Sequence, residues 1–333
     1  MNSDMGQQSE DRAVQVWTWD MLQAAALPMP HDNARGCIVA VHAHPDDEAS
    51  KGAATIARYH DEGVTTVLVT CTGGEAGSVL NPLMQVPQGP SAIASVRREE
   101  LIRSAQIIGY DHVILLGFRD SGLSPESTTD SARTFSGETF SQQHDEAVRR
   151  LMTVFRLFRP DVVITYPETQ DDYPHPDHLQ ASAITRRAFD AVQDAGTGLS
   201  SAKPRTPAKL YEVLWPDANN HSASGTAHRT LSGSCGGGPT CCTQRTVEPT
   251  AKIEVTAHAG VVSLALLAHA SQLTLDAQRS LAVPAPPTCG PLHDDYVLVR
   301  DYTGRNHVTG NDNDVESDLF SGCRPRGAVP AQG

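Results

Sequence analysis

Two short segments of the chain hold most of the residues that could do chemistry. Residues 42–48 carry two imidazoles and three carboxylates, and residues 173–178 carry a phenol, two imidazoles and a further carboxylate. Imidazole nitrogens and carboxylate oxygens form a mixed ligand set that suits zinc, and also iron and other divalent ions at the same geometry. The two segments therefore predict a metal site, provided that the fold brings them together.

Each segment alone also has an ordinary interpretation. His44 could be a core histidine, Asp177 could cap the helix that starts near Pro176, and residues 46–48 could be an acidic helix start, which the helix dipole favours. The elements that position the two segments decide between these interpretations and the metal site.

Between residues 36 and 215, short apolar runs alternate with amphipathic stretches of helical period, which is typical of a parallel sheet wrapped by helices. We predict an α/β fold: an open, mostly parallel, Rossmann-like sheet flanked by helices, with a smaller irregular C-terminal portion. Gly63 and Gly109 are expected to end the first two long helices. The expected strands are 37–41, 64–70, 113–116, 162–166 and 210–214, and the expected helices are 50–61, 92–108, 145–158 and 177–192.

A sheet of this kind binds its ligand beyond the carboxyl ends of the strands, where loops converge and helix N-termini point inward. The residues directly after positions 41, 70, 116 and 166 all include polar clusters. Both chemistry-bearing segments thus fall on one edge of the sheet. Their occurrence together at that edge favours a metal site over two unrelated helix caps.

The pattern decays after residue 215. Residues 219–250 are rich in Ser, Gly, Thr, His and Cys and are interpreted as a loop, whereas residues 253–273 regain helical character and 296–300 resemble a strand. No aromatic residue occurs between Trp215 and Tyr296, which predicts that the well-packed core lies before that gap.

Four segments follow from this pattern. We expect an N-terminal extension (1–35), a catalytic domain (36–215), a flexible Ser/Gly/Cys-rich linker or insert (216–252) and a substrate-capping C-terminal portion (253–333).

Composition excludes several classes of protein. The 333 residues are 39% hydrophobic, which excludes a disordered polyelectrolyte. A net charge of -13 repels phosphate backbones and anionic membrane surfaces, so we expect a small-molecule ligand and neither nucleic acid nor membrane as partner. The chain has no apolar run of the roughly 18 residues that a membrane span needs, and its N-terminus is polar, so a cytoplasmic location is expected.

The seven cysteines fall into two kinds of position. Cys37 and Cys71 lie in strand-like runs, where a reduced core cysteine is expected. Cys235, Cys241 and Cys242 lie in the Ser/Gly-rich stretch without the paired spacing of structural zinc sites. A flexible loop with oxidisable thiols is the favoured interpretation of that cluster.

Five motifs together resemble the LmbE/PIG-L family of zinc-dependent de-N-acetylases. They are H-P-D-D-E at 44–48, G-G-E at 73–75, R-x-x-E-L at 97–101, D-S-G at 120–122 and H-P-D-H at 175–178. The resemblance covers residues 36–211 and resumes weakly at 265–272 and 318–320. Residues 42–82, with Lys51 and the Leu-Asn-Pro run at 80–82, are most similar to the subgroup that acts on mycothiol S-conjugates.

The resemblance implies a role for each matching residue. His44, Asp47 and His178 would bind Zn²⁺, or Fe²⁺, and leave one coordination position open for water and the substrate carbonyl, which is the catalytic kind of zinc site. Asp46 would be the general base. It can have a different role from its neighbour Asp47 because adjacent residues on a tight turn point in different directions. His175 would stabilise the oxyanion or protonate the leaving amine, and Tyr173 would polarise the amide oxygen.

The same resemblance places five residues at the substrate: Lys51, Glu75, Arg97, Asp120 and His269. Their ordinary alternatives stay open. Arg97 could form a helix-surface ion pair with Glu100, Lys51 could be a solvent-exposed helix lysine, and His269 could brace the site instead of lining it.

The function implied is a metal-dependent amidohydrolase of thiol detoxification. It would cleave the amide bond of mycothiol S-conjugates, pseudodisaccharide thiol adducts, to give a mercapturic acid and glucosaminyl-inositol. One alternative is the N-acetylglucosaminyl-inositol deacetylase of mycothiol biosynthesis or another amino-sugar de-N-acetylase. A catalytically silent sugar-binding protein is the alternative of another class.

Overall fold

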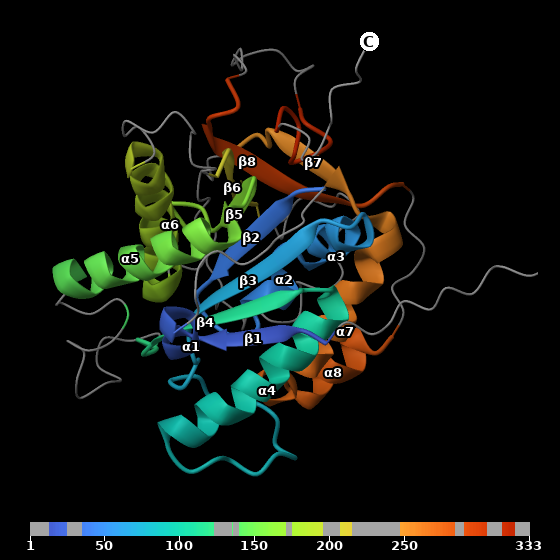
Figure 1. Ribbon diagram of the computed structural model, residues 1–333. Helices are drawn as coiled ribbons and strands as arrows, with labels where there is room; N and C mark the ends of the chain where they lie inside the picture. Colours follow the sequence, from blue (N-terminus) through green and yellow to red (C-terminus); the bar gives the residue numbers. More distant parts are fainter. Residues whose placement is uncertain are drawn as a thin grey trace, which may run out of the picture.

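A computed structural model of the chain describes residues 13–24, 35–122, 135, 140–170, 175–195, 207–214, 247–283, 290–304 and 315–323. These residues form one eight-stranded sheet in the order β1-β4-β3-β2-β5-β6-β8-β7 (Figure 1). The strands are β1 Gln15–Thr18, β2 Cys37–His42, β3 Thr65–Thr72, β4 His112–Phe118, β5 Val162–Thr165, β6 Lys209–Val213, β7 Ala251–Glu254 and β8 His293–Asp301. Strands β1 to β6 are parallel, and β8 runs antiparallel to both β6 and β7. The predicted mostly parallel α/β sheet is confirmed.

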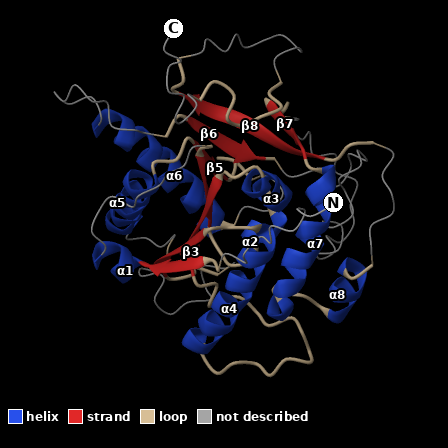
Figure 2. Ribbon diagram, turned by 45° about the vertical axis from the view of Figure 1, so that its right-hand side comes forward, coloured by secondary structure: helices blue, strands red, loops and turns tan. Residues whose placement is uncertain are grey.

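Helices cover both faces of the sheet. They are α1 Trp19–Ala24, α2 Asp47–Ser50, α3 Ala53–Asp61, α4 Pro90–Ile108, α5 Phe140–Phe158, α6 Pro176–Ala195, α7 Ala259–Ala268 and α8 Leu275–Leu281, with short 3-10 helices η4 Thr256–His258 and η5 Ala270–Gln272. Helices α5 and α6 lie on one side of the sheet and α3, α4 and α7 on the other (Figures 1 and 2). The sheet is therefore the middle of three layers.

The central strand β2 is buried along its whole length because it has a helical layer on each face. Val39 and Val41 pack into the cluster that contains α5 and α6 side chains, and the alternate residues Ile38 and Ala40 pack with Ile56 of α3. A continuous apolar run, rather than a run that alternates apolar and polar, is the pattern that such a strand requires.

Glycine conformation sets the helix ends near the site. Gly109 ends α4 with φ of 93°, as predicted. The helix expected at 50–61 is α3, which ends at Asp61 as predicted but begins only at Ala53, because Gly52 with φ of 84° separates it from the short helix α2. Helical periodicity does not register a left-handed residue. A Cβ at Gly52 would lie 2.8 Å from the hydroxyl oxygen of Tyr296 on β8, so the break is also where the C-terminal portion packs closely.

The strand order places a topological switch point between β2 and β5. From β2 the chain adds β3 and then β4 on one side, and afterwards it returns to add β5 and β6 on the other. The loops after β2 and β5 therefore diverge at their carboxyl ends, which is where open α/β sheets bind ligands.

The C-terminal portion belongs to the same core. Ile253 and Leu266 are buried in the cluster that includes Ile38 and Tyr211, so the prediction that the core ends before the aromatic-free stretch was wrong. Small aliphatic side chains fill this part of the core. The helix expected from residue 253 begins only at 259, because 251–254 alternates buried and exposed residues and pairs with β8 as strand β7.

The N-terminal segment also joins the sheet, since β1 pairs with β4 at the edge. Trp17 and Trp19 pack against the core on the α5 side, and the Arg150 guanidinium lies 4.9 Å from the ring centre of Trp19. Cys37 and Cys71 are buried thiols, as expected, whereas the stretch with Cys235, Cys241 and Cys242 lies outside the described residues. The four proposed segment boundaries stay predictions. None of the helices in the described ranges has the length and apolar character that a membrane crossing requires.

Candidate active site

The residues selected from the sequence converge at the carboxyl edge of the parallel strands. His44, Asp46 and Asp47 follow β2, Glu75 follows β3, Asp120 follows β4, and His175 and His178 stand at the start of α6, after β5. The two predicted segments thus meet at the switch point. Tyr173 lies outside the described residues.

His44 is surrounded by three carboxylates. Its Nε2 lies 3.2 Å from Asp177 Oδ2 and 3.5 Å from Asp120 Oδ1, and its Nδ1 lies 3.5 Å from Asp47 Oδ2. Burial alone would lower the pKa of His44, but the hydrogen bonds to Asp120, Asp177 and Asp47 outweigh it and raise the pKa well above its ordinary value. The site therefore favours positive charge here, and a bound cation could take the place of the proton.

Asp47 connects the two predicted histidine ligands. Its Oδ2 lies 3.5 Å from His44 Nδ1, and its Oδ1 lies 3.3 Å from His178 Nε2. Ligand atoms about 2.0–2.1 Å from a tetrahedral zinc lie about 3.3 Å from one another. Burial lowers the pKa of His178, which favours the neutral ring that binds metal. The residue types suit a zinc-like ion and each of the two spacings is close to this value, but the two histidines face different oxygens of Asp47, and the three residues are not one of the donor groups whose ligand atoms all lie within 4.8 Å of one another.

Two groups of three donors gather around His44, and neither includes Asp47. His44, His175 and His178 form one group whose ligand atoms lie within 4.8 Å of one another, and His44, Asp120 and Asp177 form a second. All five residues are buried. His44 is thus common to every arrangement of donors that could hold an ion among the described residues.

Hydrogen bonds fix the orientation of the predicted ligands. The Tyr166 hydroxyl, at the end of β5, donates to Asp47 Oδ2 at 2.7 Å and accepts from the Ala43 amide at 2.7 Å. Its ring stacks on His178, with centroids 4.5 Å apart. His178 Nδ1 lies 3.2 Å from Gln170 Oε1, which leaves Nε2 directed at Asp47. Such outer partners fix the tautomer and direction of a metal-binding imidazole.

Asp177 does not cap α6, so that alternative was wrong. It is the second residue of the helix, and its carboxylate accepts from both the amide and the hydroxyl of Ser121, at 2.9 and 2.5 Å, as well as facing His44. The bonds join the loop after β4 to the start of α6. Asp177 therefore orients His44 from the side opposite Asp47.

Lys51 points into the site. Its Nζ lies 2.6 Å from Asp47 Oδ1, and the residue is only 8% exposed, so the solvent-exposed alternative was wrong. Burial would raise the pKa of Asp47, but Lys51 and His178 outweigh it and hold the pKa well below its usual range. Asp47 is therefore an ionised carboxylate with the Lys51 ammonium and the His178 ring at the same oxygen.

Asp46 occupies a strained turn directly beside Asp47. Its φ of 108° and ψ of -24° lie in the left-handed region, which costs a non-glycine residue about 1–3 kcal/mol unless its surroundings hold it there. The Asp46 side chain keeps one third of its surface exposed, whereas that of Asp47 is buried. The turn thus aims two neighbouring carboxylates at different places. Burial raises the pKa of Asp46, and Arg97 partly offsets this.

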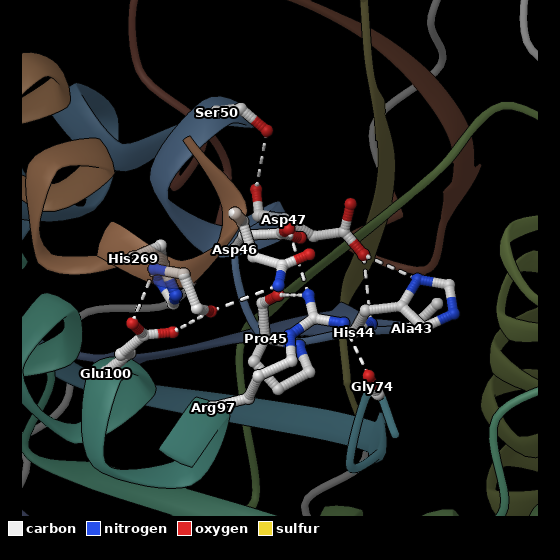
Figure 3. A network of polar contacts seen from close by, with 12 residues as sticks. Ala43, His44, Pro45, Asp46, Asp47, Ser50, Gly74, Arg97, Glu100 and His269 are labelled. Carbon is white, nitrogen blue, oxygen red and sulfur yellow. Dashed lines mark hydrogen bonds and ion pairs between the residues drawn. The ribbon is translucent and has the colours of Figure 1, made fainter. Parts of the chain in front are cut away.

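Arg97 braces this turn from α4. Its guanidinium donates to the Pro45 carbonyl, to Gly74 O at 2.8 Å and to Asp46 Oδ2 at 2.9 Å (Figure 3). Glu100 is buried and accepts from Ser271 instead, so the surface ion pair considered for Arg97 was wrong.

The His175 ring packs against the rings of both predicted histidine ligands. Its ring centroid is 4.5 Å from that of His44 and 5.0 Å from that of His178, and its Nδ1 accepts from the Asp177 amide at 3.1 Å. Burial, with a smaller contribution from the other two rings, lowers its pKa to about 4. It is thus a neutral ring beside the predicted metal ligands.

The remaining predicted substrate residues differ in accessibility. Glu75 is partly exposed and accepts from the Asp120 amide at 3.0 Å, so both lie at the site. His269 is only 1% exposed and its Nε2 lies 2.5 Å from Glu48 Oε1. The structure brings His269 to the back of the Asp46 turn, which is the bracing alternative.

Sequence reasoning missed Tyr166, Gln170 and Ser121 as parts of the site. The position of Tyr166 at a strand end was the one available signal. Ser121 stands in the D-S-G motif, but its contact with Asp177 could not be predicted, and Gln170 had no signal, because both roles depend on which loops lie next to one another.

The fold and this site define an α/β protein with a metal-type donor set and a neighbouring carboxylate at the switch point. A family model described as "PIG-L: GlcNAc-PI de-N-acetylase" matches residues 39–189. The 1D-myo-inositol 2-acetamido-2-deoxy-alpha-D-glucopyranoside deacetylase of Streptomyces griseus is 33% identical over 306 residues, which cover 86% of this chain and 89% of that protein. The chain belongs to the PIG-L family, and it is a hydrolase that acts on an amide.

Two further similarities bear on the site region and on the fold. Mycothiol S-conjugate amidase of Streptomyces coelicolor is 46% identical over 159 residues, which cover 47% of this chain and 53% of that protein, about half its length. The N,N'-diacetylchitobiose deacetylase of Pyrococcus horikoshii superposes with a TM-score of 0.50 over 73% of each chain at 19% identity, which shows a shared fold.

Proposed function

We propose that this chain is a zinc-dependent amidohydrolase that cleaves mycothiol S-conjugates into a mercapturic acid and glucosaminyl-inositol. The observation that carries this choice is the place of Lys51. The residue characteristic of the S-conjugate subgroup extends its ammonium into the site, to 2.6 Å from Asp47 Oδ1. The 46% identity to the Streptomyces coelicolor amidase supports the same choice.

The metal would be held by His44, Asp47 and His178, with Tyr166 and Gln170 holding Asp47 and His178 in place. When bound, zinc supplies a Lewis acid that polarises a carbonyl and lowers the pKa of water. His44 is held on its other side by Asp177 and Asp120, which fixes the nitrogen that faces Asp47.

Asp46 accepts the proton of the attacking water. Its side chain is the exposed member of the carboxylate pair, so a water molecule can reach it, as a general base requires. Water oxygen adds to the amide carbon, the carbon–nitrogen bond breaks, and the amine leaves with a proton.

His175 and Tyr173 complete the reaction in this proposal. His175 lies against both predicted histidine ligands, where a donor can stabilise charge on the carbonyl oxygen or pass a proton to the leaving nitrogen. Tyr173, two residues earlier, would polarise the amide oxygen. Glu75 and Asp120 would accept hydrogen bonds from sugar hydroxyls.

A comparison of two substrates tests the proposal. Full-length protein reconstituted with zinc is incubated with the bimane adduct of mycothiol and, separately, with N-acetylglucosaminyl-inositol. We expect release of the bimane mercapturate with a higher kcat/KM than acetate release. Efficient deacetylation without cleavage of the adduct would overturn the choice of substrate.

The deacetylase is the second candidate, favoured by the match to the Streptomyces griseus enzyme over 89% of its length. The same experiment separates the two, because each product is measured directly. A protein that binds sugar without catalysis would release neither product.

A further inference from the structure

The strained turn at Asp46 is supported by a buried carboxylate. The Asp46 amide donates to Glu48 Oε2 at 2.9 Å, and Glu48 is fully buried. A left-handed residue keeps its conformation only when several contacts hold it. Arg97 binds the Asp46 carboxylate and the Ala49 amide donates to the Asp46 carbonyl at 3.2 Å, whereas the Asp46 backbone amide is held by the side chain of Glu48.

The second oxygen of Glu48 is held by two other parts of the chain. Its Oε1 accepts from the Ser104 hydroxyl of α4 at 2.5 Å and lies 2.5 Å from His269 Nε2. One oxygen of Glu48 thus holds the turn, while the other is anchored to α4 and to the C-terminal portion. His269 is 221 residues away in the sequence, so only the tertiary fold creates this contact.

The segment that carries His269 is itself fixed on α4. The amide and hydroxyl of Ser271 donate to the two Glu100 oxygens at 2.7 and 2.6 Å, and all of these atoms are buried. With its Nε2 on Glu48 and 1% of its surface exposed, His269 has little surface to offer a sugar. The nearly complete burial of His269 indicates that it supports the turn at Asp46 and does not contact substrate.

We propose that His269 is a positioning residue that acts through Glu48 to hold the Asp46 carboxylate in its reactive direction. The inference rests on the proposed role of Asp46 as general base. It extends the site to the C-terminal portion, from which one buried imidazole controls a proton transfer without touching substrate.

The test is a double-mutant cycle on the metal-reconstituted full-length chain. It combines His269→Ala with Asp46→Asn and uses whichever of the two amide substrates the wild type cleaves. Asparagine tolerates left-handed backbone, so Asp46→Asn removes the base with little change of conformation. Metal content and Tm are measured for every variant. His258→Ala is the matched control, because His258 lies directly before α7 and pairs with Asp61, whose side chain is exposed.

We expect His269→Ala alone to lower kcat on the order of 100-fold, as misplacement of a reacting group does, with KM and metal content unchanged. In the Asp46→Asn background the same change should alter kcat by less than about twofold, the usual error of additivity. His269→Gln, whose amide nitrogen can reach Glu48, should recover most of the activity, and His258→Ala should lose none.

Two outcomes would overturn the positioning role. One is a double variant in which the kcat losses of the two single variants multiply, and the other is a kcat that His269→Gln does not recover. If His269→Ala does not fold, the cycle is run with Glu48→Gln in its place and read by the same criteria. Cleavage of the acetylated sugar alone would overturn the proposed substrate and leave the cycle readable. Full activity of Asp46→Asn would instead remove the base on which the inference rests.

Discussion

Two parts of one sheet meet at the site and contribute different kinds of residue. Strands β2 to β5, with the loops and the helix start that follow them, supply every described residue that is proposed to hold metal or transfer a proton. The portion from β7 onward supplies buried polar contacts instead: His269 to Glu48, Ser271 to Glu100, Asp294 to Thr55 and Glu316 to Lys209.

The difference follows from how each part is placed. A residue directly after a parallel strand is positioned by a short turn, so a local sequence can specify it. A residue that supports the site from the C-terminal portion must instead contact a buried polar or charged group. That group and the supporting residue can lie far apart in the sequence. If this division is correct, changes in the parallel part should affect catalysis and metal binding, and changes in the C-terminal portion away from His269 should affect stability.

Asp46→Asn should have the largest effect. Loss of a general base lowers kcat by about 10²- to 10⁴-fold, and the ligand set is left intact. Steady-state kinetics together with metal analysis check this. A variant that loses its metal as well would show that Asp46 is a ligand and not the base.

Glu316→Ala should rank second, as a stability effect. Glu316 lies 2.5 Å from Lys209, which is fully buried, and also bonds the Tyr211 hydroxyl. Leaving a buried ammonium without its carboxylate costs about 3–5 kcal/mol of unfolding free energy. Urea denaturation measures it, and Asp276→Ala, which breaks an exposed ion pair with Arg279, is the control. A drop in kcat for the folded variant would contradict a purely structural role.

Gln170→Ala should weaken metal binding by about 10- to 100-fold, the usual cost of losing an outer partner of a ligand histidine. The variant frees His178 Nδ1 from the oxygen 3.2 Å away. Chelator competition measures the affinity, and Gln193→Ala, far along α6, serves as the control. Unchanged affinity would exclude Gln170 as the residue that orients His178.

Asp294→Asn should have the smallest effect and change the pH dependence of stability. Burial raises the pKa of Asp294, although its Oδ2 accepts from the Thr55 amide and hydroxyl at 3.1 and 2.7 Å. The folded state therefore holds the proton more tightly than the unfolded state. The protonated Asp294 side chain therefore adds to the free energy of unfolding. This stabilisation is complete below about pH 4, the pKa in the unfolded state, and is lost as the pH rises through the raised pKa of the folded state.

The asparagine variant keeps a neutral acceptor at every pH. We expect it to be more stable than the wild type at pH 7, by about 1 kcal/mol, and the difference to shrink toward pH 4. Parallel urea titrations from pH 4 to 7 measure it. A difference that grows as the pH falls would mean that the charged form stabilises the fold.

The sequence determined the parallel sheet, because buried strands and amphipathic helices leave a periodic signal, and it predicted a site at the strand ends, because H-P-D-D-E directly follows one strand and H-P-D-H stands at the start of the helix after another. It also predicted His44, Asp47 and His178 as metal ligands, and the fold places Asp47 within 3.5 Å of each histidine. Only the tertiary structure showed that Lys51 turns inward, that Gly52 divides a helix and that Tyr166 holds Asp47.

The role of the C-terminal portion also became evident only from the tertiary structure. Its small aliphatic residues gave no aromatic signal, yet they complete the core, and His269 contacts Glu48 across 221 residues of sequence. Local pattern encodes which face of an element is apolar and which residues follow a strand. Which distant side chain meets a buried carboxylate depends on the packing of whole elements, and no local pattern records it.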